Sequence, residues 1–163
     1  MKNQLITDFY ELPIEKIMNK NLWDLPIIEK NDDILNVLNI LSGRHHIWVI
    51  NNKEDKELLG VITEHDILTT LSPHNFSPYV FGVPDLRSLL YGTVKTAEDI
   101  MSKKIITCEP DEKILDILKR MKKFQLRRLP VIQNKKLIGE ITLHRLIQKY
   151  YKATQYHSLE EEG

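Results

Sequence analysis

One stretch of the chain has the residue types and spacing to hold a sugar. Residues 60–66 read Gly-Val-Ile-Thr-Glu-His-Asp, which predicts a strand running into a helix. The first amides of such a helix have no internal partners and carry partial positive charge. Thr63 can offer its hydroxyl there, and Asp66 presents a carboxylate on the same side of the first turn. Two carboxylate oxygens can accept from both hydroxyls of a ribose, so this junction is a candidate nucleoside site.

A simpler interpretation of the same residues needs no ligand. Thr-x-x-Asp has the pattern of a capping box, in which the two side chains satisfy backbone amides. A second junction, residues 138–147, repeats the first with Thr142 but places Arg145 where Asp66 stands. A cation is mildly unfavourable at a helix N-terminus. Arg145 therefore requires an anion, a ligand phosphate or room to turn away.

Basic residues precede the central strand of each copy. Arg44-His45-His46 lead into residues 47–50, and Arg127-Arg128 lead into residues 129–132. If a pseudo-twofold axis relates the copies, these side chains converge into a phosphate-binding patch. The alternative is a solvated charge run, because cations are favourable near helix C-termini.

The elements that position these residues occur twice. Residues 59–68 return as 138–147, and an Ile-Met pair opens each copy at 17–18 and 100–101. Each copy predicts the order β-α-β-β-α, an α/β (α+β) fold in which two pseudo-twofold related units pack sheet to sheet. The predicted elements are strand 25–28, helix 34–41 with Gly43 as a left-handed C-cap, strands 47–50 and 58–62, helix 64–71, strand 105–108, a helix from 109–112 onward, strands 129–132 and 137–141, and a last helix capped by Thr142.

These elements divide the chain into five segments. We expect an irregular lead-in over 1–16, a first unit over 17–71 and a second over 97–150. Between them, 72–96 is an aromatic-rich insert with a short helix at 85–90, and 151–163 is a C-terminal tail.

Composition narrows the class of protein. The 163 residues are 42% hydrophobic and carry no net charge, so no field of one sign indicates a nucleic-acid or membrane partner. The single Cys108 excludes a disulfide framework, and no apolar run is long enough for a bilayer or a signal peptide. We expect a cytoplasmic protein. No nucleophile, base and orienting group occur together, and no histidine has paired metal spacing, so we expect neither an enzyme nor a metal site.

Over residues 17–71 and 97–150, the chain resembles a tandem pair of CBS domains, a stand-alone Bateman module. The resemblance is carried by the order of elements, the Ile-Met openings, the Leu-Pro-Val-Ile strand and the Gly-x-x-Thr-x-x-Asp ending. The resemblance implies regulatory binding of AMP, ADP, ATP, S-adenosylmethionine or a relative in the cleft between the copies, with no catalytic cofactor. It assigns Asp66 to the ribose, Thr63 to the ribose or a phosphate, Val61 and Ile62 to one side of the base, Ile106 to the other, and His45, Arg127, Arg128 and His144 to the phosphates. Because Arg145 replaces the acid in the second copy, the resemblance implies one competent site.

Three functions follow as hypotheses. The leading one is an adenosyl-ligand sensor that forms a homodimer through its CBS modules and signals to an unknown effector protein. A ligand-independent dimerisation scaffold would use Asp66 only as a cap. A nucleic-acid-associated module would use the basic stretch 119–128, but zero net charge and the lack of an aromatic platform beside it count against this.

Overall fold

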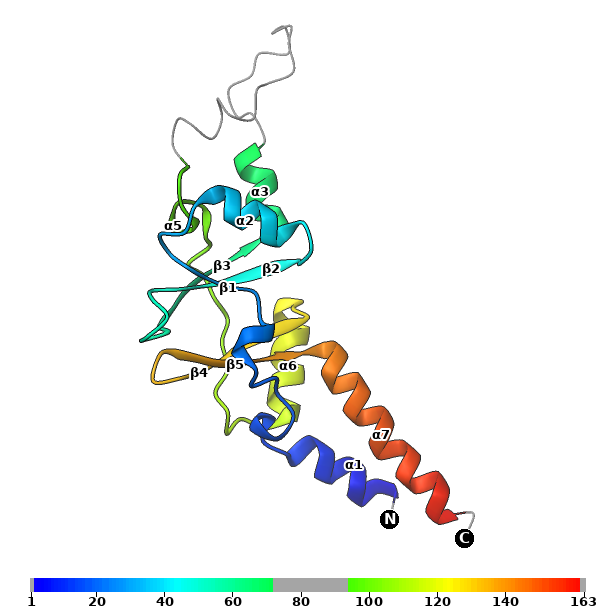
Figure 1. Cartoon of the computed structure of the whole chain (residues 1–163). Coiled ribbons are helices and arrows are strands. Elements are labelled where there is room, and N and C mark those ends of the chain that lie inside the picture. Colours follow the sequence, from blue (N-terminus) through cyan, green and yellow to red (C-terminus); the bar gives the residue numbers. More distant parts are fainter. Residues whose placement is uncertain (1, 72–93, 162–163) are drawn as a thin grey trace, which may run out of the picture. The chain divides into compact units, whose positions relative to one another are not determined.

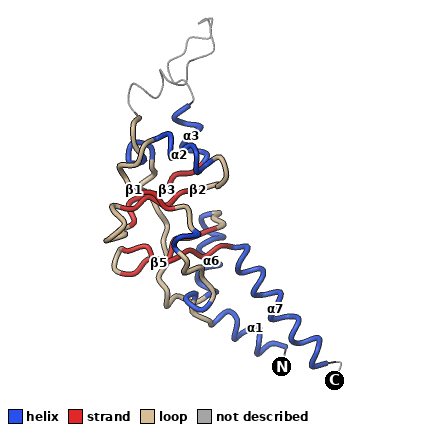
Figure 2. The backbone as a smooth tube through the Cα atoms, viewed as in Figure 1, coloured by secondary structure: helices blue, strands red, loops and turns tan. Residues whose placement is uncertain are grey.

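The computed structural model describes residues 2–71 and 94–161 (Figure 1). Contacts divide the chain into two compact units, and each is described by itself. The β1–β3 unit comprises Trp23–Ile105, and the β4–β5 unit comprises Met1–Leu22 with Ile106–Gly163. Each unit combines a small sheet with helices, which confirms the predicted α+β class (Figure 2).

The β1–β3 unit is built on three strands that bring Thr63 to the sheet edge. Its elements are β1 (Ile27–Glu29), α2 (Ile34–Leu41), β2 (His46–Ile50), β3 (Leu58–Thr63), α3 (Glu64–Leu71) and α5 (Ala97–Ile100), after a 3-10 turn, η2 (Leu22–Asp24). Strand β2 is central, parallel to β1 and antiparallel to β3. The register sets His46 opposite Thr63 at one end of the hairpin and Ile50 opposite Leu58 at the other.

Helix α2 forms where apolar spacing and a cap coincide. Asp33 is its N-cap and accepts a hydrogen bond from the Leu35 amide at 2.8 Å. Ile34 and Val37 are buried with Ile47, Val49 and other residues in one core. The helix end differs from the prediction: Ser42 is the C-cap, in the right-handed conformation, and Gly43 does not adopt a left-handed one. The left-handed cap occurs instead at Gln125 after α6.

The β4–β5 unit has a smaller sheet than the sequence predicts. Its elements are α1 (Lys2–Glu11), a 3-10 turn η1 (Ile14–Lys16), α6 (Ile114–Phe124), β4 (Arg128–Gln133), β5 (Lys136–Thr142) and α7 (Leu143–Glu161). The predicted strand 105–108 is reduced to one parallel bridge between Cys108 and Val131. Helix α7 runs without a break past residue 150, so the predicted tail has no structural boundary there.

Helix α1 corrects the prediction of an irregular lead-in. Its Phe9 is buried and packs edge-on against Tyr150 of α7, with ring centroids 5.4 Å apart. Glu11 pairs with Lys113, and the Leu12 carbonyl accepts from the Ile114 amide at 2.9 Å. A ten-residue helix is only marginally stable in isolation, and tertiary packing stabilises α1 here. Local helix propensity alone therefore did not indicate this helix.

The opening segment of each copy packs in the unit formed by the other copy's hairpin. Ile17 and Met18 belong to the core of the β4–β5 unit, whereas Ala97 and Ile100 belong to that of the β1–β3 unit. Backbone bridges fix both segments, Asn19 with Glu140 and Ser102 with Val61. The units defined by contacts therefore divide the chain differently from the segments 17–71 and 97–150, which stay a prediction from the repeat.

The repeated glycine has a packing role. A Cβ at Gly139 would lie 2.6 Å from the Asn19 carbonyl oxygen, and one at Gly60 would lie 2.9 Å from that of Ser102. Real Cβ atoms do not approach backbone oxygens so closely. Each glycine therefore lets an opening segment pair with a hairpin strand.

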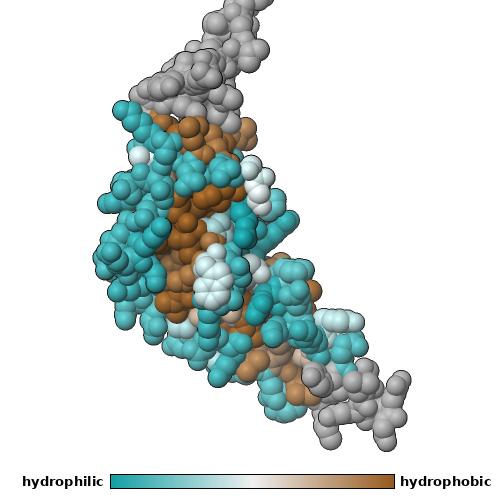
Figure 3. Space-filling view, in the orientation of Figure 1, coloured by the Kyte–Doolittle hydropathy of each residue, from teal (hydrophilic) through white to brown (hydrophobic). Residues whose placement is uncertain are grey.

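The insert lies almost wholly outside the described residues, and so does its predicted helix at 85–90. In the part that is described, no helix is both long and apolar enough to cross a membrane. The surface of the β1–β3 unit shows a band of apolar atoms (Figure 3), and Leu35 and Leu68 are among its exposed large hydrophobic residues.

Candidate functional site

The junction between β3 and α3 holds the Asp66 carboxylate on the first turn of the helix. Asp66 Oδ2 accepts from the Thr63 amide at 2.8 Å and from the Thr63 hydroxyl at 3.3 Å. Both residues are half-buried. Thr63 ends β3 and Glu64 begins α3, so the strand-to-helix prediction is confirmed. The carboxylate is thereby oriented at the end of the helix that favours negative charge.

A second Thr-x-x-Asp pair in the same unit provides an internal comparison. Asp99 Oδ2 accepts from the Thr96 amide at 2.9 Å and from the Thr96 hydroxyl at 3.3 Å, in a capping box at the start of α5. Hydrogen bonds from the amides of Lys95 and Thr96 hold the pKa of Asp99 below its usual range. This pair is exposed and precedes a helix of only four residues. Capping geometry therefore occurs in this chain without a sugar-binding context and does not by itself define a site.

Arg145, the counterpart of Asp66, turns away from the first turn of α7. The Thr142 hydroxyl accepts from the Arg145 amide at 3.1 Å, which confirms Thr142 as the predicted cap. The Arg145 Nε donates to the Ile17 carbonyl at 2.7 Å. Ile17 is the C-cap of η1, where carbonyls lack helical partners. The guanidinium thus binds the opening segment in place of an anion.

The residues predicted to flank a base differ in what they expose. Ile62 has 0% exposure and belongs to the core of the β1–β3 unit, so its side chain is committed to packing. Any contact between Ile62 and a ligand would have to use its backbone. Val61 is half-buried, and its amide and carbonyl pair with Ser102 at 3.0 and 2.8 Å. Ile106 packs against the core of the β4–β5 unit. Their roles at a base stay predictions.

The predicted phosphate-facing residues are divided between the units. His45 belongs to the β1–β3 unit and is exposed, with its Nδ1 at 2.8 Å from Glu64 Oε1. Arg127, Arg128 and His144 belong to the β4–β5 unit, where Arg128 opens β4 and His144 lies in the first turn of α7. Their convergence on one ligand stays a prediction. Sequence reasoning missed Glu64, although an acid next to Thr63 in the first turn was a visible signal.

Cys108 and the candidate metal-ligating side chains of the described residues can be examined for reactivity. Burial raises the pKa of the Cys108 thiol to about 12, and its Sγ donates to the Pro130 carbonyl at 3.6 Å. A protonated, buried thiol is a poor nucleophile and a poor metal ligand. Across residues 2–71 and 94–161, no group of three or more His, Cys, Asp or Glu side chains is placed to hold a metal ion.

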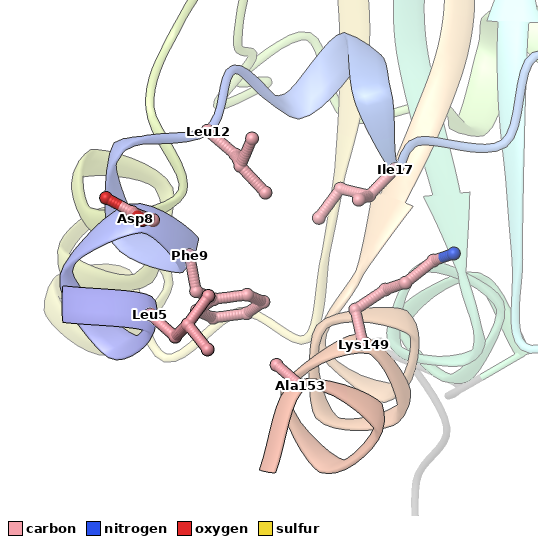
Figure 4. A pocket seen from close by; sticks show the side chains of 7 residues that line it. All are labelled: Leu5, Asp8, Phe9, Leu12, Ile17, Lys149 and Ala153. Carbon is pink, nitrogen blue, oxygen red and sulfur yellow. The ribbon is translucent and has the colours of Figure 1, made fainter. Parts of the chain in front are cut away.

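A small pocket of about 230 Å³ lies between α1 and α7, and none of the residues predicted for a ligand lines it (Figure 4). Leu5, Phe9, Leu12, Ile17 and Ala153 supply its apolar wall. Figure 4 shows the Lys149 amine and the Asp8 carboxylate pointing away from Phe9. The wall of the pocket is therefore mainly apolar.

Comparison with known proteins now places this fold and these junctions in a family. The CBS domain model matches residues 14–73 and 97–152, and the chain belongs to the CBS domain family. An uncharacterised protein of Methanocaldococcus jannaschii, MJ1426, is 28% identical over 154 residues, which span 82% of this chain and 91% of that protein. The chain spans only 18–52% of other curated relatives, which include two homoserine O-acetyltransferases.

Solved structures of CBS pairs share the fold. CBSX2, crystallised in complex with AMP, has a TM-score of 0.68 and 19% identity, over 87% of this chain and 98% of that chain. The CBS domain pair of MJ0100, in complex with 5′-methylthioadenosine and S-adenosyl-L-methionine, has a TM-score of 0.59 and 21% identity, over 86% and 97%. The tandem CBS pair predicted from the repeat is thereby confirmed.

Proposed function

We propose that this chain is a regulatory module that binds one adenosyl ligand, with its ribose on Asp66. The observation that carries the proposal is the contrast between the two junctions. Asp66 is half-buried and oriented on the first turn of α3, whereas Arg145 at the matched position is bound to the Ile17 carbonyl. One junction retains a diol-binding group and the other does not, which supports a single site.

Two lines of evidence support an adenosyl compound as the proposed ligand. CBS pairs with this fold have been crystallised with AMP and with 5′-methylthioadenosine and S-adenosyl-L-methionine. In this chain, Asp66 in the first turn of α3 can accept from ribose hydroxyls, and the half-buried Val61 lies on β3, the strand that leads into this helix. Ile106, on the other side of the base, and the basic residues His45, Arg127, Arg128 and His144 complete the proposed set.

The proposed activity is regulation and not catalysis. A group that holds a diol binds a ligand without transforming it. Regulation then requires that the ligand favour one of two conformations or assemblies of the protein, since only differential affinity shifts an equilibrium. We propose a homodimer and an effector protein, in the cytoplasm, as the context in which that shift is read.

Ligand-dependent thermal stability tests the proposal, with a matched control in the same unit. Asp66→Ala and Asp99→Ala remove the same kind of helix cap, which costs about 1 kcal/mol each. With wild-type protein, an adenosyl ligand at about 100 times its dissociation constant should raise the melting temperature by roughly 5–10 °C. We expect Asp66→Ala to lose that rise and Asp99→Ala to keep it.

Other outcomes distinguish the alternatives. If no adenosyl compound raises the melting temperature and the two variants behave alike, Asp66 is only a cap and the scaffold hypothesis replaces the sensor. If the protein instead binds RNA or DNA with an affinity that falls steeply with salt and is unchanged in Asp66→Ala, the nucleic-acid hypothesis replaces it.

A further inference from the structure

The first turn of α3 carries a second carboxylate with a histidine attached. Glu64 Oε1 lies 2.8 Å from His45 Nδ1, and the two side chains are 67% and 80% exposed. Glu64 is the first residue of α3 and Asp66 the third. His45 immediately precedes β2, whose first residue is paired with Thr63. The His45–Glu64 pair therefore stands at the same end of the hairpin as the Asp66 carboxylate.

The pair gives no net positive charge in either protonation state of the histidine. When the imidazole is neutral, its Nδ1 hydrogen is donated to Glu64, and Nε2 presents a lone pair that accepts hydrogen bonds. A lone pair and a carboxylate both repel phosphate oxygens. When the imidazole is charged, it and Glu64 cancel. With Asp66 added, the side chains of His45, Glu64 and Asp66 carry a net charge of −2 or −1, not counting His65, which lies between the two acids.

The matched positions in the β4–β5 unit have the opposite charge. Arg127 corresponds to His45, Leu143 to Glu64 and Arg145 to Asp66, so two cations and one apolar residue replace a histidine and two acids. The duplicated motif has thus diverged in charge as well as in the ribose-binding position. At these matched positions, acidic residues occur in the copy that retains Asp66 and not in the other.

On this basis, and resting on the proposed function, we infer that Glu64 selects against phosphorylated nucleotides. The ligand class is an adenosyl compound whose 5′ substituent is neutral or cationic, such as a thioether or a sulfonium with an amino group. The carboxylate of Glu64 and the Nε2 lone pair of His45 can accept hydrogen bonds from the amino group of a sulfonium ligand. A thioether donates no hydrogen bond and is favoured only because it carries no negative charge. His45 then accepts a hydrogen bond from the ligand instead of binding a phosphate, and the inference replaces the predicted phosphate role of Arg127, Arg128 and His144 as well.

Calorimetric titration of the full chain at one ionic strength tests the inference with four probes. These are 5′-methylthioadenosine, S-adenosylmethionine, AMP and ATP. We expect AMP and ATP to bind at least tenfold more weakly than the two sulfur compounds. In Glu64→Gln, which keeps the side-chain shape and removes the charge, the affinity for AMP should rise about fivefold, and the affinity for S-adenosylmethionine should fall.

The control is Glu54→Gln, the same chemical change at an exposed residue in the turn at the opposite end of the β2–β3 hairpin. It should leave all four affinities unchanged. Glu64→Leu, which copies the residue at position 143, should shift selectivity in the same direction as Glu64→Gln, and its melting temperature without ligand reports whether the fold is kept.

The outcomes separate the two claims. If AMP binds as tightly as the sulfur compounds, or if Glu64→Gln does not change the preference between them, the inference on Glu64 is wrong while the adenosyl site stands. If none of the four probes binds, the proposed function itself fails.

Discussion

At the scale of single residues, the positions of Asp66, Asp99 and Arg145, each three residues after a threonine, can be compared through their hydrogen bonds. The Asp66 carboxylate accepts from Thr63 and the Asp99 carboxylate from Thr96, whereas Arg145 donates to the Ile17 carbonyl. Sequence spacing predicted the position of Asp66 and the cap at Thr142. It could not predict where Arg145 turns, because its acceptor lies 128 positions away in the chain.

Cys108 provides a residue-scale prediction on reactivity. The thiol is 2% exposed and its pKa is raised to about 12 by burial, so almost no thiolate exists at neutral pH. We expect a disulfide exchange reagent to modify native protein at least about 100-fold more slowly than unfolded protein at pH 8. The measurement is the modification rate with and without denaturant. Equal rates would show that Cys108 is accessible in the native state.

Glu112 provides a prediction on pH. Hydrogen bonds from Arg120 hold the pKa of this carboxylate below its usual 4.5. A lowered pKa in the folded state gives stability that is complete above the unfolded value and is lost as the pH falls through the folded one. Glu112→Gln should therefore reduce the free energy of unfolding at pH 7 by about 1–2 kcal/mol.

The same variant should also flatten the loss of stability below pH 4.5. Denaturant melts at several pH values measure both effects. Glu109→Gln, three residues away and exposed, is the control. If Glu112→Gln and Glu109→Gln have the same pH profile as the wild type, the Arg120–Glu112 pair does not contribute.

At the scale of elements, local patterns predicted most helices and strands, and packing decided the exceptions. The hairpins β2–β3 and β4–β5 follow the alternation and turns seen in the sequence. Helix α1 forms because Phe9 and Tyr10 pack against Tyr150, and the strand expected at 105–108 retains only the Cys108 bridge. Contacts between residues far apart in the chain decide whether helix α1 and the strand at 105–108 form. A short stretch of sequence therefore cannot predict either outcome.

The glycine of the repeated motif gives an element-scale prediction. Gly139→Ala places a Cβ against the Asn19 carbonyl, which belongs to a paired backbone segment and cannot move aside easily. We expect a loss of about 1–3 kcal/mol in the free energy of unfolding. Gly43→Ala is the control, because its Cβ would meet no atom within 4 Å. Denaturant melts should separate the two variants, and equal stabilities would contradict the packing role of Gly139.

At the scale of the whole molecule, duplication explains the architecture and divergence explains the proposed function. Each opening segment, Ile17–Met18 and Ile100–Met101, packs in the unit that holds the other copy's hairpin. The sequence predicted two copies from their similarity. Similarity cannot show whether an opening segment packs with the hairpin of its own copy or with that of the other copy, because the same residues would be used in either case. The copies then differ at Asp66 and Arg145, which is the basis for the proposal of one site per chain.

Calorimetric stoichiometry tests this central claim most directly. A titration of the wild-type chain with 5′-methylthioadenosine or AMP should give one ligand per chain, and Asp66→Ala should abolish the binding heat while Asp99→Ala retains it. Two ligands per chain, or undiminished binding in Asp66→Ala, would contradict the account of a single adenosyl site on Asp66.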